Sequence, residues 1–181
     1  INLSDLVALS SDYDTTDKAT QMFFAETQNK LLYAVTQKTA AEIIVSRADA
    51  NSPNMALTNW KGTKVRKQDI YIAKNYLTKD EIDTLNRLVV IFLETAELRI
   101  KERIDISMEF WTKNVDRLLE FNNKPLLASK GSISNKEMED KVSEMYHLFE
   151  DRRKKQEAIA DDKMELNELN ELEKKLKRRE K

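Results

Sequence analysis

The sequence predicts an all-α fold, a helical bundle with a long central helix and a charged C-terminal helical arm. Its 181 residues include only two Gly and two Pro, too few for the turns of a β-sandwich or a nucleotide-binding α/β fold. Apolar residues recur at spacings of three and four, which is the helical period. Ser or Thr followed three residues later by Glu, the capping-box signature of a helix start, occurs three times.

The first predicted helix runs from about Thr16 to Val35. Acids and hydroxyl residues, which cap free amide groups at a helix start, precede it: Asp12, Asp14, Thr15, Thr16 and Asp17. These acids could also attract a hard cation, but the segment lacks the glycine and the distal glutamate of a calcium loop, so we predict no metal site. Gln28 falls on the same face as Phe24 and Leu31, which predicts an amide pointing at the core.

Short elements follow this helix. A second helix is predicted from the capping box Thr39–Glu42 to about Ala50. Pro53 then favours a short helical turn, because proline at the first helical position loses no hydrogen bond, and Gly62 can end that turn in a left-handed conformation. A further short helix is expected from about Asp69 to Leu77.

The longest predicted helix of the bundle opens with the capping box Thr78–Glu81. Its buried stripe is Ile82, Leu85, Val89, Phe92 and Ala96. The segment Leu88–Leu93 is apolar on every face, so we expect neighbours to surround it and this helix to be the central one. The stripe becomes basic at Arg99 and Arg103, where we expect the helix to leave the core.

Two more helices complete the predicted bundle. Ser107 caps the first, whose buried stripe is Met108, Trp111, Val115 and Leu118. The capping box Ser134–Glu137 starts the second, whose inward residues are Met138, Val142, Met145 and Phe149. From Asp151 onward 20 of 31 residues are charged, 11 basic and 9 acidic. We therefore predict a bundle domain at 1–150 and a charged helical arm at 151–181.

The arm carries a narrow apolar stripe: Ile159, Leu166, Leu169, Leu172 and Leu176. Gln156 and Lys163 interrupt the heptads, so the pattern leaves open a coiled coil or a lone solvated helix. We predict that the arm binds a second copy of the chain or a partner protein.

The composition excludes several classes of function. The absence of Cys excludes disulfides, thiolate metal sites and Cys nucleophiles, and a single His excludes a multi-histidine zinc site. No apolar run approaches the roughly 20 residues of a membrane span and no signal peptide is present, so we expect a cytoplasmic protein without membrane contact. Phosphate-loop and metalloprotease signatures are also missing, so we predict no cofactor and no standard enzyme.

A basic stretch from Ala50 to Gln68 is the first candidate site. It contains no acid, and its four cations are Lys61, Lys64, Arg66 and Lys67. Such a local field can hold phosphates and the Trp60 indole can stack a base, which predicts direct contact with nucleic acid. The alternative is a solvated basic loop that Trp60 anchors to the core.

A group of polar residues with one Trp is the second candidate site, interpreted as a binding pocket: Gln28, Asn29, Arg47, Asp49, Asn54 and Trp60. So polar a cluster exceeds what the core of a helical bundle requires, although a buried structural network has the same appearance in sequence. Arg47, Asp49 and Asn54 beside Lys61 also leave open an enzyme acting on nucleic acid or a nucleotide. The sequence does not fix paired carboxylates for acid–base work.

The chain contains many short motifs in a fixed order: Phe23–Leu31, Thr39–Ile44, Arg47–Ala50, Pro53–Met55, Leu57–Thr58, Trp60–Gly62, Val65–Lys67, Ala73–Leu77 and Leu85–Arg87. Through these motifs residues 10–150 resemble the bacterial virulence RhuM family. The resemblance implies the downstream helical domain of a DNA-associated protein from a mobile or virulence-linked locus, with a DNA-binding-like segment upstream. The start at Ile1 agrees with a piece of a longer protein.

Two positions depart from the pattern of that family. Gln37 and Ala56 stand where the resemblance implies glycine. If these backbone positions need a positive φ, residues with side chains must build the local turns.

Overall fold

The computed structural model describes residues 7–8, 10–14, 16 and 18–179, and every regular element in this part of the chain is helical. The all-α prediction is confirmed. The α-helices are α2 (Lys18–Thr36), α3 (Ala40–Arg47), α4 (Lys79–Lys101), α5 (Met108–Phe121) and α6 (Asn135–Arg179). Three short 3-10 turns connect α3 to α4, namely η1 (Pro53–Ala56), η2 (Asp69–Tyr71) and η3 (Ala73–Tyr76).

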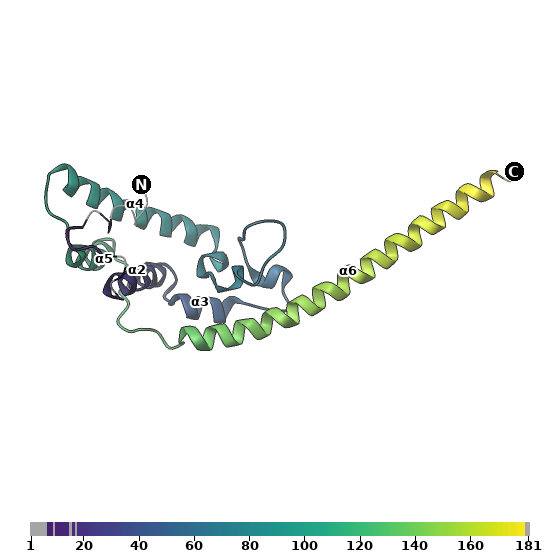
Figure 1. Cartoon of the computed structure of the whole chain (residues 1–181), viewed down its shortest axis with the longest axis horizontal. Helices are drawn as coiled ribbons and strands as arrows, with labels where there is room; N and C mark the ends of the chain where they lie inside the picture. The colour runs from purple at the N-terminus through teal and green to yellow at the C-terminus, as the bar shows by residue number, and fades with distance from the viewer. Residues whose placement is uncertain (1–6, 9, 15, 17, 180–181) are drawn as a thin grey trace.

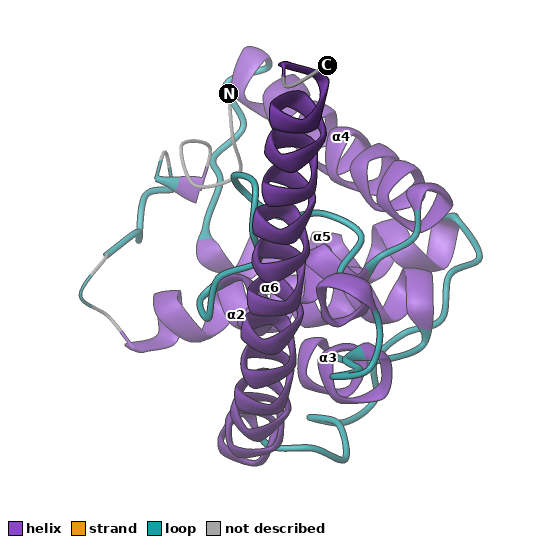
Figure 2. Cartoon of the chain, turned by 90° about the vertical axis from the view of Figure 1, so that its right-hand side faces the viewer, coloured by secondary structure: helices purple, strands orange, loops and turns teal. Residues whose placement is uncertain are grey.

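Helix α2 occupies the centre of the bundle, where it packs against α3, α4 and α5. Helix α6 packs on α3 with its first half and continues past the body as a single rod (Figure 1). In Figure 2 this rod points toward the viewer and the other helices gather behind it. The predicted boundary near residue 150 therefore falls inside one unbroken helix.

The helix starts are where the capping signals predict them. The Thr78 hydroxyl accepts from the Glu81 N–H at 3.3 Å, and the Glu81 carboxylate accepts from the Thr78 N–H at 2.8 Å. Ser107 caps α5 by accepting from the Phe110 N–H at 3.2 Å. Because such caps depend only on residues three apart, the sequence alone locates them.

The acidic segment before α2 has a role that the sequence did not indicate. Asp12 accepts from the Met108 N–H at 2.8 Å, so it caps α5 rather than the helix that follows it in the chain. Asp14 accepts from the N–H and hydroxyl of Thr16, at 2.8 and 2.7 Å. Thr15 and Asp17, which were also predicted to cap this helix, lie outside the described residues.

Large aromatic side chains fill the core between α4, α5 and the η turns. Trp111 is fully buried, its ring lies 5.2 Å from that of Phe92, and its indole N–H donates to the Ser10 hydroxyl at 2.8 Å. The buried Tyr76 hydroxyl donates to the Ile70 carbonyl at 3.0 Å. Because each polar atom has a partner, these rings contribute their full hydrophobic area without an unpaired donor.

The predicted inward position of Gln28 is wrong, because its side chain is exposed. The buried face of α2 is set by Phe23, Thr27 and Leu31. Thr27 precedes Gln28 by one residue, which is about 100° around the helix. Phe24, which is half-buried, therefore marks the edge of the buried face, and Gln28 lies beyond it.

The expectation that neighbours surround Leu88–Leu93 is also wrong. Val90 and Ile91 are 54% and 42% exposed, because α4 lies at the edge of the bundle and buries one face against α2 and α5. The buried residues of that face are Leu85, Leu88, Phe92 and Ala96.

The turn after Pro53 is present but left-handed. Asn54, Met55 and Ala56 have φ values of 54°, 55° and 61°, a run of conformations that side chains disfavour. The turn ends at Ala56, so Gly62 does not terminate it as predicted, although Gly62 has a φ of 93°. Residues 69–77 likewise form two 3-10 turns in place of one short helix.

Gln37 and Ala56, where the resemblance implies glycine, both have the positive φ that glycine favours. Gln37 has a φ of 58°, and its N–H donates to the Tyr33 carbonyl at 2.8 Å. This single bond is the left-handed cap that commonly ends a helix with glycine. The chain therefore keeps the turn and carries the steric cost of a side chain there.

We expect Gln37→Gly to raise the free energy of unfolding by about 1 kcal/mol, because glycine relieves left-handed strain of about 1–2 kcal/mol and costs some backbone entropy. Urea denaturation measures the change. Gln37→Ala is the matched control, since alanine keeps the strain. Equal stability of the two variants would contradict the interpretation.

Candidate functional site

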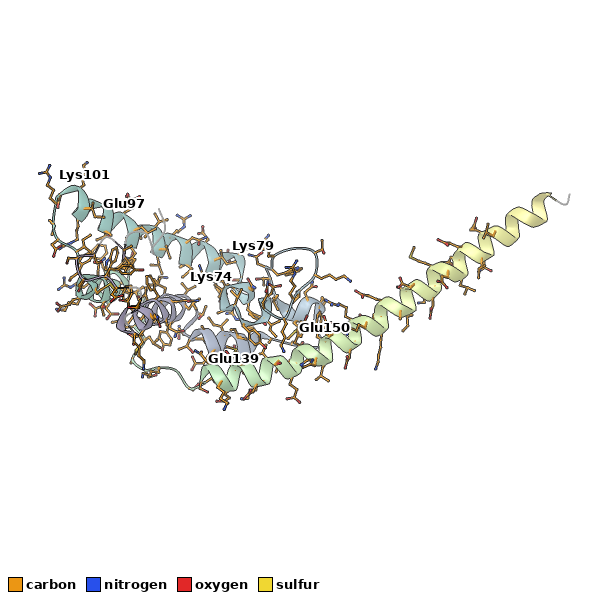
Figure 3. The ribbon with its side chains drawn as sticks, in the orientation of Figure 1. Lys74, Lys79, Glu97, Lys101, Glu139 and Glu150 are labelled. Atoms are coloured by element: carbon orange, nitrogen blue, oxygen red, sulfur yellow. The ribbon has the colours of Figure 1, made fainter. Side chains whose placement is uncertain are left out.

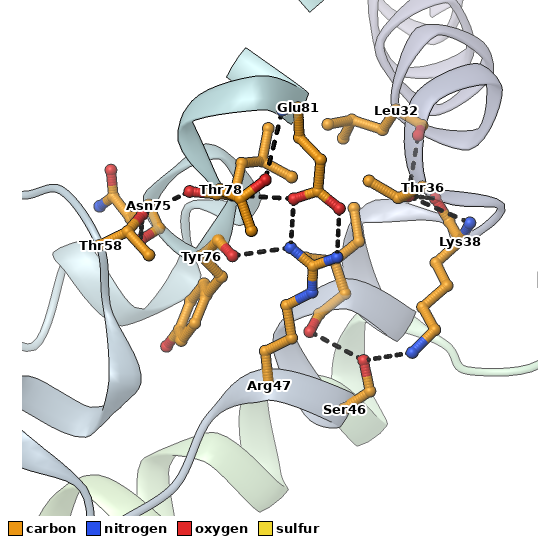
Figure 4. A network of polar contacts seen from close by, with 12 residues as sticks. Leu32, Thr36, Lys38, Ser46, Arg47, Thr58, Asn75, Tyr76, Thr78 and Glu81 are labelled. Atoms are coloured by element: carbon orange, nitrogen blue, oxygen red, sulfur yellow. Dashed lines mark hydrogen bonds and ion pairs between the residues drawn. The ribbon is translucent and has the colours of Figure 1, made fainter.

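The guanidinium of Arg47 is the centre of a polar network at the end of α3 (Figure 4). It donates to both carboxylate oxygens of Glu81 at 2.6 Å and to the Tyr76 carbonyl at 2.8 Å. The same carboxylate accepts from the Thr78 N–H at 2.8 Å. This network ties α3 and η3 to the first turn of α4, so the guanidinium has a structural role.

Two carboxylates in the body are unusually acidic. Hydrogen bonds from Arg47 lower the pKa of Glu81 to about 2, because they stabilise its charged form. Hydrogen bonds from the backbone N–H groups of Ser132 and Thr39 lower the pKa of Glu42 to about 2. Partial burial of each carboxyl opposes the shift but is outweighed.

The other polar candidates near Arg47 turn to different partners. Asp49 accepts from the Asn51 N–H at 2.9 Å and from the Ser52 hydroxyl at 2.6 Å, and these bonds lower its pKa. Asn54 lines a groove of about 330 Å³ against α6. The described side chains of Arg47, Asp49 and Asn54 therefore do not form one acid–base arrangement.

The remaining members of the polar set are also dispersed. Asn29 accepts from the Ala40 N–H at 2.9 Å, which fixes the start of α3 to α2. Trp60 packs against the core with its indole nitrogen buried, in agreement with an anchoring role, while Gln28 faces solvent. Their role in binding a ligand stays a prediction.

A groove of about 640 Å³ lies between α2 and the loop before α6, and Asn29 lines it. Ser132 also lines this groove, and Glu42 holds it in place: the Glu42 carboxylate accepts from both the N–H and the hydroxyl of Ser132 at 2.7 Å. Next to this bond, Gly131 has a φ of 88°, and a Cβ there would lie 2.8 Å from the Thr39 side chain. Sequence reasoning missed this contact, because Glu42 and Ser132 are 90 residues apart and Glu42 was already assigned to a cap.

The basic segment forms an exposed loop beside α6. All four cations are exposed, and Lys64 forms an ion pair with Glu157 of α6 at 2.6 Å. Within the described ranges, no carboxylate oxygen lies within 4 Å of the charged groups of Lys61, Arg66 or Lys67. These three cations are therefore available to an external anion.

Two arginines of α6 join this loop to the helix. Arg153 donates to the Val65 carbonyl at 3.4 Å, pairs with Glu150 and lies 5.7 Å from the centre of the Phe149 ring. Arg152 donates to the Asn51 side chain at 3.1 Å. These contacts lie near the end of the packed part of α6, which also includes the ion pair of Glu157 with Lys64.

Beyond the ion pair of Glu157 with Lys64, α6 extends away from the body (Figure 3). Every described side chain from Lys154 to Leu172 is exposed. The exposed set includes large apolar side chains, with exposed fractions of 55–63%: Ile159, Met164, Leu166, Leu169 and Leu172. Large apolar side chains in such number on one free helix are typical of an interaction surface.

A comparison with family models matches residues 1–157 to the Virulence protein RhuM family. This chain belongs to the RhuM family. No curated protein and no solved structure matches the chain. The RhuM match covers the body, the basic loop and the joint with α6, and residues 158–179 of the arm lie outside it.

The described part of this RhuM-family chain offers no group of three or more His, Asp or Glu side chains that could hold a metal ion. In the same part of the chain, no helix combines the length and apolar character needed to cross a membrane.

We expect the free energy of unfolding to fall as the pH drops from about 5 to about 2. Glu42 and Glu81 have folded pKa values of about 2, below their ordinary value of 4.5, so their contribution is complete above pH 4.5 and lost on acidification. Urea denaturation across this range measures the slope, to which one group adds at most about 1.4 kcal/mol per pH unit.

Glu81→Gln should lower stability at pH 7 by about 1–2 kcal/mol, since the pair is partly screened by solvent, and should flatten the acid dependence. Glu94→Gln, an exposed acid of α4, is the control and should leave the slope unchanged. A Glu81→Gln slope equal to that of the unmodified chain would refute the assignment.

Proposed function

We propose that this RhuM-family chain is a binding and assembly domain of a DNA-associated bacterial protein. In this proposal residues 1–150 form the scaffold, and residues 151–181 form an arm that pairs with the arm of a second copy. The observation that carries the proposal is the exposed apolar stripe on the free half of α6. The family match supports membership alone, so the DNA association rests on the resemblance described above.

The direction of the stripe supports pairing with another molecule. Phe149 is buried against the body, whereas Leu148, one residue away, is 61% exposed. Leu166 and Leu169 lie about 100° and 160° around the helix from Phe149. The body therefore covers a different side of α6, and a partner helix can lie along the stripe without contacting the scaffold of the same chain.

The energetics favour pairing over a lone helix. A single helix with no packed face is marginal in water, because most helical stability in proteins comes from packing. Burying a Leu or Ile side chain contributes about 1.5–3 kcal/mol. Ile159, Leu166 and Leu169 occur once in each chain, so a pair of arms gains this contribution six times before the cost of association.

We expect light scattering of the full chain to give the mass of a dimer, and the double variant Leu166→Glu and Leu169→Glu to give that of a monomer. The reason is that two carboxylates on each arm would have to be buried in the pair.

Met164→Glu is the matched control, because Met164 is equally exposed at 63% but lies about 160° from Leu166 around the helix. It should leave the dimer intact. A monomeric mass for the unmodified chain at all concentrations would reject the proposal.

A second candidate function is direct binding of nucleic acid through the basic loop. Its support is that Lys61, Arg66 and Lys67 are exposed and that no described carboxylate pairs with them, with Arg152 beside them on α6. The buried indole nitrogen of Trp60 favours contact with phosphates over stacking of bases. Binding of this kind is independent of sequence and depends strongly on salt.

We expect the triple variant Lys61→Glu, Arg66→Glu and Lys67→Glu to lose affinity for a labelled DNA duplex and to show a shallower salt dependence. The slope of the logarithm of affinity against the logarithm of salt should change by about one for each lost contact. Lys64 is kept because it holds α6.

The control is a second triple variant, in which Lys79, Lys101 and Lys136 are each replaced by Glu. These lysines are exposed elsewhere on the body, so the control changes the net charge by the same amount. Fluorescence anisotropy measures both variants. Equal retention of DNA by the two triple variants would rule out the basic loop as the binding site, and preference for single-stranded RNA would redirect the proposal to that ligand.

A further inference from the structure

We infer that the Glu157 carboxylate of α6 is a built-in competitor for the basic loop, and that a nucleic-acid phosphate displaces it before the loop can use Lys64. This inference rests on the second candidate function, because it presupposes that the basic loop binds nucleic acid. It adds a regulatory contact to that site. The observations that carry it are the position of one carboxylate oxygen, the exposure of the ion pair and the charges around it.

Lys64 differs from the other three cations of the basic loop. Its Nζ atom lies 2.6 Å from the Oε1 atom of Glu157, which belongs to α6 and is 93 residues away in the chain. Among the residues that the structure describes, no carboxylate pairs with Lys61, Arg66 or Lys67. One of the four positive charges of the loop is therefore neutralised from within the chain.

The same carboxylate oxygen lies near a second cation. The Oε1 atom of Glu157 is 4.0 Å from the Nε atom of Arg153, a buried nitrogen without a hydrogen-bond partner in the described structure. Glu150 pairs with another nitrogen of this guanidinium and balances part of its charge. Lysine and arginine contact phosphates through oxygens that carry negative charge, as they do carboxylates. Glu157 therefore occupies a position between the loop and α6 that also suits a phosphate oxygen.

The Glu157 carboxyl is ionised at neutral pH. The hydrogen bond from Lys64 lowers its pKa, and the charges of Lys64 and Arg153 lower it further, whereas desolvation opposes the shift. Because Lys64 and Glu157 belong to one chain, the carboxylate competes as a tethered group, and its effective concentration does not depend on the amount of protein.

The ion pair is also weak enough to be displaced. The side chains of Lys64 and Glu157 are 61% and 46% exposed, and exposed ion pairs are screened by water and salt. A DNA duplex presents a dense row of phosphates, and each phosphate that meets a cation releases counterions. A duplex held by the other three cations of the loop can thus take over Lys64 as a fourth contact.

The first test compares two single variants by fluorescence anisotropy with a labelled DNA duplex. Glu157→Gln should raise the affinity about twofold to fivefold and steepen the salt dependence by about one, because Lys64 becomes available. Glu165→Gln is the matched control, since Glu165 is an exposed acid of the same helix and its replacement changes the net charge equally. Equal affinities of the two variants would overturn the inference.

The double variant Lys64→Gln and Glu157→Gln removes the ion pair without changing the net charge. If Glu157 keeps Lys64 from the duplex, the double variant binds with the affinity and salt dependence of the unmodified chain. An affinity several-fold lower would show that Lys64 contacts DNA while Glu157 is in place, and this result would contradict the inference.

Displacement can be followed directly by carbodiimide crosslinking, which joins a lysine and a carboxylate in contact through an amide bond. The Lys64–Glu157 crosslink should form in the free chain, and its yield, measured by mass spectrometry of the peptides, should fall as the DNA duplex saturates the chain. The Lys30–Asp116 crosslink is the internal control, because this ion pair of 2.8 Å joins α2 to α5 and should persist. A constant Lys64–Glu157 yield while DNA is bound would refute displacement.

The outcomes separate this inference from the function on which it rests. If neither the unmodified chain nor Glu157→Gln binds the duplex, the second candidate function fails and the inference fails with it. If both bind and Glu157→Gln matches Glu165→Gln, only the competition is overturned, and the basic loop remains the candidate binding site.

Discussion

One constraint governs the distal half of this molecule: a single helix, α6, has its apolar residues on one side at its start and on another side at its end. Met138, Val142 and Phe149 attach the helix to the body. Beyond Arg153 the apolar side chains have rotated away from that body. The described part of the helix is unbroken and does not fold back to bury them, and in our proposal a second copy of the chain covers them. The scaffold thus holds the arm at its base and leaves the stripe exposed.

The polar residues early in the chain maintain the body that supports this arm. Arg47 and Glu81 close the junction of α3 with α4, and Glu42 holds the loop that leads into α6. Each of these polar groups finds its hydrogen-bond partner in a distant part of the chain: Arg47 in Glu81, and Glu42 in Ser132. A polar cluster that is unusual for a helical bundle is explained here mainly by such junctions between short elements.

The sequence predicts helix starts well and helix faces less well, for a physical reason. Capping boxes such as Thr78–Glu81 are complete within four residues, so no tertiary information is needed to find them. Which face of α2 is buried depends on the neighbouring helices. The predicted face was wrong by one residue, because Thr27 is buried and Gln28 is exposed. The bond between Glu42 and Ser132 spans 90 residues and has no local signal. The residue types provide no signal for the left-handed turn at Asn54–Ala56, because none of them is glycine, and only the family resemblance pointed to a positive φ at Ala56.

The central claim is that the free half of α6 is covered by a second copy. Hydrogen exchange of the backbone amides of residues 156–172, followed over a series of protein concentrations, tests it directly. The account predicts slow exchange at concentrations where the dimer forms and fast exchange on dilution, while amides of α2 stay protected throughout. Exchange of residues 156–172 that is equally fast at every concentration would contradict it.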